Sequence, residues 1–94
     1  MKTRWTTSAL SDLEAIGDFV ARHNPAAAER LVARIAAATE TLRDHPHLGG
    51  PGRIGGTREL VVAETPYVVP YRVAEGEVQI LAVFHGARRW PDKL

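Results

Sequence analysis

The chain has 94 residues, the usual size of one domain, so we expect residues 1–94 to share a single core. It has no cysteine, which excludes disulfides and thiolate zinc sites, and its formal net charge of +1 lacks the broad basic field of general nucleic-acid binders. No apolar run approaches the ~20 residues needed to cross a bilayer. The charged N-terminus is not followed by a signal-peptide core. We therefore expect a cytoplasmic protein without membrane contact.

The first half of the chain predicts a short strand and a helical hairpin. Residues 4–6 can form the strand, and Thr7 or Ser8 can cap the helix that follows. The apolar residues of this helix recur at helical spacing: Leu10, Leu13, Ile16, Phe19 and Val20. Asn24 before Pro25 predicts the start of a second helix, because proline loses nothing there by lacking an amide hydrogen. The short joint makes the two helices antiparallel.

The second half predicts a loop and three strands. Residues 45–56 are too rich in glycine and proline for regular structure, and we interpret them as a compact turn between the hairpin and the sheet. The apolar runs 57–64, 67–74 and 78–84 indicate consecutive antiparallel strands. Pro70 cannot donate to a strand ladder, so we expect a local defect there. The order βααβββ predicts an α+β fold, with the hairpin packed on one face of a largely antiparallel four-stranded sheet and the other face solvated.

Conventional catalytic and metal-binding patterns are weak. The acidic residues near the start of the chain lie on a helix whose exposed face requires polar side chains anyway. His45 and His47 lack a nearby third ligand, and the glycine-rich segment 49–56 lacks the lysine and hydroxyl residue of a phosphate-binding loop. We therefore predict no metal and no cofactor.

The segment after the last predicted strand carries the most chemistry. It contains His85, Arg88, Arg89 and Trp90 within six residues. Arginine beside an exposed aromatic ring is typical of a contact surface for protein or nucleic acid. The alternative is that His85 and Trp90 cap the core and the arginines are merely solvated.

Several segments, in this order, resemble the RelE/ParE toxins of bacterial type II toxin-antitoxin systems. They are the Trp5 opening, Ala9 with Asp12-Leu13, Asn24-Pro25, His45-Pro46 with Gly49, and residues 56–60, 66–73 and 85–91. The resemblance covers nearly the whole chain and implies the RelE/ParE toxin fold, held inactive by a cognate antitoxin whose disordered C-terminal segment folds along the toxin. The expected docking places are an apolar groove by the hairpin and the solvated sheet face. The candidate antitoxin contacts are Leu13, Phe19, Val20, Leu31, Ile35 and Arg72.

The two branches of the family act differently. RelE-like members cleave messenger RNA on the ribosome without a metal, and ParE-like members are associated with poisoning DNA gyrase. The RNA-cleaving branch commonly carries an arginine at the position of Val68, which cannot stabilise phosphate charge. The lysines of its preceding strand and its late tyrosine are also missing here. These departures favour a ParE-like gyrase inhibitor that arrests growth and is not an enzyme, with target contacts at His85, Arg88, Arg89, Trp90 and, from the glycine-rich loop, Arg53.

Two alternatives stay open. A RelE-like, ribosome-dependent endoribonuclease acting on mRNA would use His85 as acid or base, with Arg58, Arg72 and Arg88 stabilising phosphate charge. A non-toxic relative would bind the antitoxin and serve only as a co-repressor of its own operon.

Overall fold

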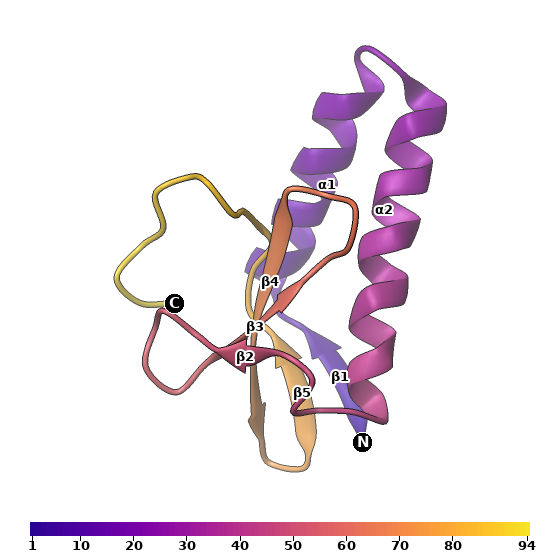
Figure 1. Ribbon diagram of the computed structural model, residues 1–94. Helices are drawn as coiled ribbons and strands as arrows, with labels where there is room; N and C mark the ends of the chain where they lie inside the picture. The colour runs from indigo at the N-terminus through magenta and orange to yellow at the C-terminus, as the bar shows by residue number, and fades with distance from the viewer.

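The computed structural model describes all residues, 1–94. The elements in chain order are β1 (Lys2–Trp5), α1 (Thr7–Ala21), α2 (Pro25–Glu40), the 3-10 turn η1 (Thr41–Arg43), β2 (Gly50–Pro51), β3 (Arg58–Val61), β4 (Tyr67–Ala74), β5 (Glu77–Ile80) and β6 (Phe84–His85). Figure 1 shows the helical hairpin on one side of the sheet, and the β2 loop and the C-terminal segment on the other. The predicted α+β arrangement, with a helical hairpin on one sheet face, is confirmed.

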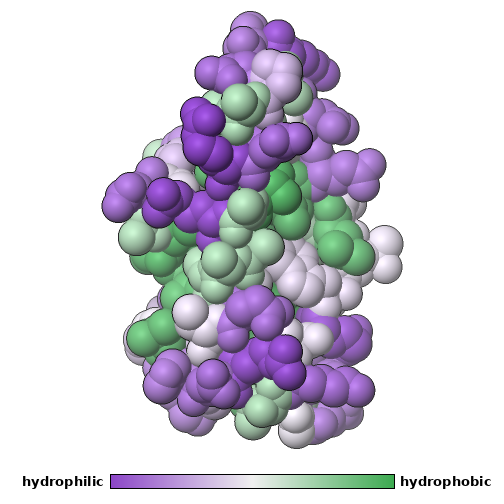
Figure 2. Space-filling model, turned by 90° about the vertical axis from the view of Figure 1, so that its right-hand side faces the viewer, coloured by the Kyte–Doolittle hydropathy of each residue, from purple (hydrophilic) through white to green (hydrophobic).

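Local sequence signals explain both helix starts. The Thr6 hydroxyl accepts a hydrogen bond from the Ala9 amide at 3.1 Å, so the cap of α1 lies one residue before the predicted pair Thr7 and Ser8. The Asn24 side chain accepts from the Ala27 amide at 3.0 Å, with proline in the first turn of α2, as predicted. No helix is both long and apolar enough to span a membrane. Figure 2 shows the α2 side of the molecule, where hydrophilic residues dominate the upper end and hydrophobic residues occur in separate patches below.

The sheet has the strand order β1-β5-β4-β3-β2, and β6 pairs with β4 beyond the end of β5. All pairs are antiparallel except β1 with β5, which is parallel. The four longer strands are those expected from the sequence. The two-residue strands β2 and β6 are additions: β2 lies within the segment interpreted as a loop, and β6 is the end of the last predicted strand, separated from β5 by residues 81–83.

The predicted defect at Pro70 interrupts the ladder on the side of β4 that pairs with β5 and β6, whereas the register with β3 is continuous. The register shifts by one residue between the Tyr71–Ile80 and Val68–Phe84 pairs, which is a β-bulge. Pro70 accepts from the Leu81 amide at 3.0 Å but has no hydrogen to return to the Leu81 carbonyl. That carbonyl instead accepts from the Thr6 hydroxyl at 3.3 Å. The proline therefore ends the β4–β5 ladder without leaving the Leu81 carbonyl unpaired.

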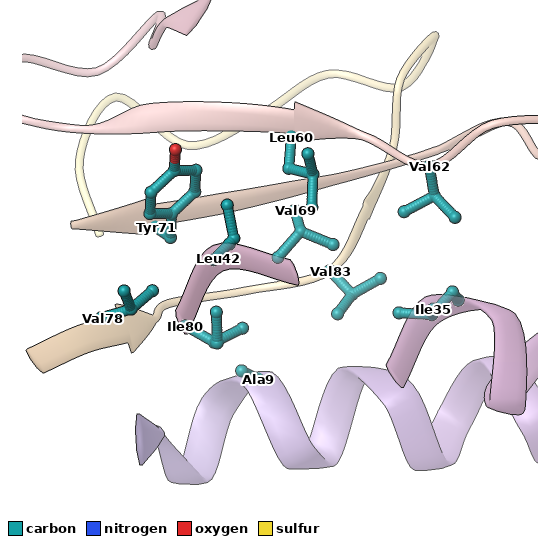
Figure 3. Packing of buried hydrophobic residues seen from close by; sticks show 10 residues of the cluster. All are labelled: Ala9, Ile35, Leu42, Leu60, Val62, Val69, Tyr71, Val78, Ile80 and Val83. Atoms are coloured by element: carbon teal, nitrogen blue, oxygen red, sulfur yellow. The ribbon is translucent and has the colours of Figure 1, made fainter. Parts of the chain in front are cut away.

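The hydrophobic core lies between the helices and the facing side of the sheet (Figure 3). Its buried members are Ala9, Ile35, Leu42, Leu60, Val62, Val69, Tyr71, Val78, Ile80 and Val83. Ile35 is a member of this cluster and is 0% exposed. The structure therefore corrects the assignment of Ile35 to an antitoxin surface: its side chain stabilises the core and does not reach a partner of the folded chain.

A clamp of hydrogen bonds fixes the glycine-rich loop against the core. The buried Tyr71 hydroxyl donates to the Pro46 carbonyl at 2.8 Å and accepts from the Gly49 amide at 2.9 Å. The Arg58 guanidinium donates to the Gly49 carbonyl at 2.7 Å and to the His47 carbonyl at 3.4 Å. The loop is thus the compact connection that its composition indicated, although part of it pairs as β2.

The sheet face away from the helices is only partly solvated, which corrects the expectation for it. Near β1 and β5 it is polar, and Arg4 lies 2.8 Å from the Glu77 carboxylate. Near β4 it is covered, because Val68 and Pro70 are buried and a Cβ at Gly86 would lie 3.3 Å from Val68. The loop after β2 and the C-terminal segment lie on this side in Figure 1.

The ion pair on this face predicts a pH-dependent stability. The hydrogen bond from Arg4, and then that from Gln79, holds the pKa of Glu77 below its ordinary value of 4.5. The carboxylate's contribution is therefore fully present above that value and is lost as pH falls through the lower folded-state pKa. Glu77→Gln should lower the free energy of unfolding at neutral pH, and its difference from wild type should vanish as pH falls below the lowered folded-state pKa of Glu77. Urea titrations measure this, with the exposed Glu29→Gln as control; a difference that persists unchanged in acid would contradict it.

Candidate functional site

The residues after β6 form a tight turn tied to the sheet, which we call the C-terminal segment (His85–Trp90). The His85 carbonyl accepts from the Arg88 amide at 3.1 Å and from the Trp90 indole nitrogen at 3.2 Å. The His85 Nδ1 atom accepts from the Ala87 amide at 3.2 Å, and the Gly86 amide donates to Pro66 at 2.8 Å. These bonds hold the segment in one conformation against the end of β4.

The aromatic and the basic side chains of this segment differ in their surroundings. Trp90 is partly buried against Phe84, with ring centroids 5.0 Å apart, and the His85 ring meets Tyr67 edge-on at 5.8 Å. Arg88 and Arg89 are exposed, and neither side chain takes part in an ion pair or hydrogen bond. The aromatic rings therefore anchor the segment, and the two guanidiniums point into solvent without a partner in the chain.

The C-terminal segment borders an open groove of about 330 Å³, which we call the tail groove. One wall is a stripe of α1, formed by Asp12, Ala15, Ile16 and Phe19, and the rest is Tyr67, Val83, Phe84, His85, Arg88, Arg89 and Trp90. The Asp12 carboxylate accepts from the Val83 amide at 3.0 Å, which ties α1 to the strand end. Phe19 is 57% exposed at the mouth. The groove is thus apolar in its walls, with two unpaired arginines among its lining.

Arg53 reaches the C-terminal segment from the loop before β3. Its guanidinium carbon lies 3.6 Å from the centroid of the Trp90 ring, and its terminal nitrogens donate to the Gly86 carbonyl at 3.4 and 3.5 Å. Its Nε lies 3.4 Å from a Glu59 carboxylate oxygen. The structure therefore brings all five sequence-predicted target contacts together, but the Arg53 guanidinium is already engaged within the protein.

The residues predicted for RNA cleavage are not brought together. Arg58 pairs with Tyr71, four residues along β4 from Tyr67, the partner of His85, which corresponds to about 13 Å along a strand. The Arg58 guanidinium is also bound to loop carbonyls. Arg72 lies on the opposite sheet face from Tyr67 because side chains alternate along a strand. Of the predicted nuclease set, only His85 and Arg88 share the groove.

The predicted antitoxin contacts are similarly divided. Phe19 is exposed and lines the tail groove. Leu13 and Leu31 are partly buried and pack against the core, and Val20 is partly buried. Arg72 pairs with Gln79 on the sheet face away from the helices. These residues do not form one continuous surface.

Of the groove residues outside the C-terminal segment, the sequence-based predictions included Phe19 as an antitoxin contact but did not include Asp12, Ala15, Ile16 or Tyr67. Asp12, Ala15, Ile16 and Phe19 repeat at three and four residues, and that spacing would have revealed a shared stripe of α1. Tyr67 had no comparable signal, because its contact with His85 depends on the two-residue pairing of β4 with β6. No group of three or more histidine, aspartate or glutamate side chains is placed to hold a metal ion.

A helical hairpin packed on a mixed sheet is the class of fold seen in a solved structure of a ParDE system. A chain of the structure titled "Chromosomal ParDE TA system from P. aeruginosa" superposes with a TM-score of 0.82 and 32% identity, covering 90% of this chain and 95% of that one. The sequence profile described as "ParE toxin of type II toxin-antitoxin system, parDE" matches residues 3–90. The chain therefore belongs to the ParE toxin family of type II toxin-antitoxin systems.

Two similar sequences carry toxin names. The chain is 46% identical over 93 residues to "Putative toxin Y4kP" of Sinorhizobium fredii, covering 99% of this chain and 96% of that protein. It is 42% identical over 84 residues to "Toxin RelE2" of Caulobacter vibrioides, covering 89% and 93% respectively. The resemblance to RelE/ParE toxins, with the ParE-like branch favoured, is confirmed.

Proposed function

We propose that this toxin arrests growth by inhibiting DNA gyrase in the cytoplasm, through the exposed arginines of the C-terminal segment. The observation that carries the proposal is the pair Arg88 and Arg89, which have no side-chain partner and stand on a turn fixed by backbone bonds and aromatic contacts. A rigid base lowers the entropy lost on binding, and arginine beside tryptophan is the composition of an interface hot spot.

The arrangement favours binding over catalysis. A phosphate-cleaving site needs its charge-stabilising groups within hydrogen-bond reach of one reacting centre. Here Arg58 is committed to the loop and Arg72 lies on the other sheet face. We therefore assign the toxin no reaction of its own in the leading proposal.

A second candidate, an mRNA endoribonuclease, is supported by one contact. His85 and Tyr67 meet edge-on at 5.8 Å inside the groove that also contains Arg88. Because His85 Nδ1 accepts the Ala87 amide, its neutral ring carries the proton on Nε2, and that N–H can donate a hydrogen bond to a phosphate oxygen of RNA. In this candidate site His85, Tyr67 and Arg88 take the place of the set expected from the sequence, which also included Arg58 and Arg72.

Induced expression without antitoxin separates these candidates. Purified gyrase is assayed for supercoiling and trapped cleavage complexes, and transcript ends are mapped from the same cells. Inhibited gyrase with intact transcripts is the expected result. New transcript ends with unaffected gyrase would replace the proposal by the nuclease, and normal growth would identify a non-toxic, co-repressing relative.

We further propose that a cognate antitoxin neutralises the toxin by covering the tail groove. Phe19 from α1 and the arginines of the C-terminal segment line the same groove, so a partner segment seated on Phe19 would lie over Arg88 and Arg89. Antitoxin and gyrase would then compete directly. An apolar peptide face fits the aromatic walls, and acidic side chains fit the arginines.

Phe19→Ala should weaken antitoxin binding about tenfold or more, because a large exposed aromatic side chain in a groove is a typical anchor. The fold should be unaffected, since Phe19 is 57% exposed. Leu10→Ala is the matched control: Leu10 is 52% exposed on the same helix but does not line the groove. Titration calorimetry with the antitoxin measures both. Equal affinities for the two variants would exclude the groove as the docking site.

A further inference from the structure

We propose that Arg53 is a positioning residue that holds the C-terminal segment in its binding conformation. For its effect on growth this inference rests on the proposed function, but its effect on the segment is independent of any target. The guanidinium of Arg53 contacts both Glu59 of strand β3 and the C-terminal segment.

The Glu59 carboxylate binds both the backbone amide and the guanidinium of Arg53. The Arg53 amide donates to Glu59 Oε2 at 2.6 Å, and the Arg53 Nε faces Glu59 Oε1 at 3.4 Å. Glu59 belongs to β3, pairs with both Gly50 and Pro70, and its side chain is only 14% exposed. The carboxylate is therefore held by the sheet, and it orients the plane of the guanidinium.

The oriented guanidinium of Arg53 stacks on the ring of Trp90. Its ring lies between the Arg53 guanidinium at 3.6 Å and the Phe84 ring at 5.0 Å, and its indole nitrogen donates back to His85 within the segment. Outside the segment, therefore, the ring rests on Phe84 and Arg53. The same guanidinium also donates to the Gly86 carbonyl, so it contacts the segment near its start, at Gly86, and at its end, at Trp90.

Arginine is suited to this position for a chemical reason. A planar guanidinium stacks on an indole through its face and donates from its edge to a carboxylate and a carbonyl at the same time. Lysine has one compact ammonium and cannot do both. The segment's other arginines, Arg88 and Arg89, make no such contacts and remain free.

Limited proteolysis tests the inference, because trypsin cuts after Arg88 and Arg89 only when the segment opens. Arg53→Met should raise the cleavage rate there about tenfold, as expected when cleavage follows the open population. The cleavage ratio is the rate of cleavage after Arg88 and Arg89 divided by the rate of cleavage after Arg34. Arg34 lies within α2, so cleavage there rises only if the whole domain unfolds. Glu59→Gln should raise the same ratio.

Arg43→Met is the matched control. Arg43 is 53% exposed and lies 3.4 Å from Glu40, against 48% and 3.4 Å for Arg53 and Glu59, but it does not contact the segment. Its ratio should equal that of wild type. An unchanged ratio for Arg53→Met would overturn the inference. So would an equally large rise when Arg53→Met is added to Trp90→Leu, because the contact with Trp90 would then contribute nothing to the role of Arg53.

Growth arrest at equal protein level completes the test. Weakened arrest for Arg53→Met, with an elevated ratio, supports the positioning role. Full arrest for Arg53→Met, with arrest lost when Arg88 and Arg89 are both alanine, overturns the positioning role and leaves the proposed function in place. Full arrest for all of these variants overturns the proposed function itself, whatever the cleavage ratio.

Discussion

Replacing Arg88 and Arg89 together by alanine should abolish growth arrest and gyrase inhibition. Both guanidiniums are exposed and unpaired, so their removal costs the folded toxin nothing measurable. If each is a hot spot of about 2 kcal/mol, target binding weakens roughly a thousandfold. The measurement is the concentration of purified toxin that halves gyrase supercoiling, beside growth after induction.

The control for this double variant removes the same charge elsewhere. Arg30→Ala with Arg34→Ala also deletes two exposed arginines, but from α2, outside the tail groove. It should retain full arrest. The Arg88 and Arg89 variant should bind antitoxin more weakly, because it lacks two cations of the tail groove, but it should still co-purify with it, because Phe19 and the rest of the hairpin are unaltered. Arrest of wild-type strength in that variant would refute the C-terminal segment as the target surface.

Gly49→Ala should strongly destabilise the toxin, and the neighbouring Gly50→Ala should not. A Cβ at position 49 would lie 2.6 Å from the Glu59 carbonyl oxygen and 2.7 Å from Tyr71 Cε1, which is closer than real Cβ contacts. Neither neighbour can move freely, because one is sheet backbone and the other is a fully buried ring. Overpacking of this kind costs about 1–3 kcal/mol.

Thermal unfolding followed by circular dichroism measures the difference. At roughly 4–8 °C per kcal/mol for a domain of this size, Gly49→Ala should lower Tm by about 10 °C. A Cβ at position 50 meets nothing within 4 Å, so that variant should stay within a few degrees of wild type. Similar Tm values for the two variants would mean that the Tyr71 clamp does not constrain the loop.

The Tyr71 clamp and the Arg53 contacts belong to the same loop. The Tyr71 clamp fixes the start of the glycine-rich loop, and Arg53, four residues after Gly49 in that loop, reaches the C-terminal segment. The clamped loop therefore positions the Arg53 guanidinium, and that guanidinium in turn positions Trp90. The toxin's proposed contact surface is built by the sheet and its loops, although it lies beyond the last strand.

The sequence determined the features that depend on near neighbours in the chain. Asn24 and Pro25 specified the start of α2, because a cap and its amide are three residues apart. Strand β4 was predicted with its observed bounds. Pro70 predicted the local defect, because a missing amide hydrogen has the same effect in any sheet. The basic and aromatic composition of residues 85–90 identified the candidate contact segment before its geometry was known.

Tertiary structure decided what depends on distant pairing. Ile35 and Phe19 are both apolar residues of amphipathic helices, yet one is fully buried and the other mostly exposed. Periodicity defines a stripe on a helix, but only the packed sheet decides which part of that stripe it covers. Likewise, Tyr67 joins His85, and Arg53 joins Trp90, through contacts whose partners are far apart in sequence. Such contacts form only when folding has compensated the entropy of closing the intervening chain, and no local pattern records them.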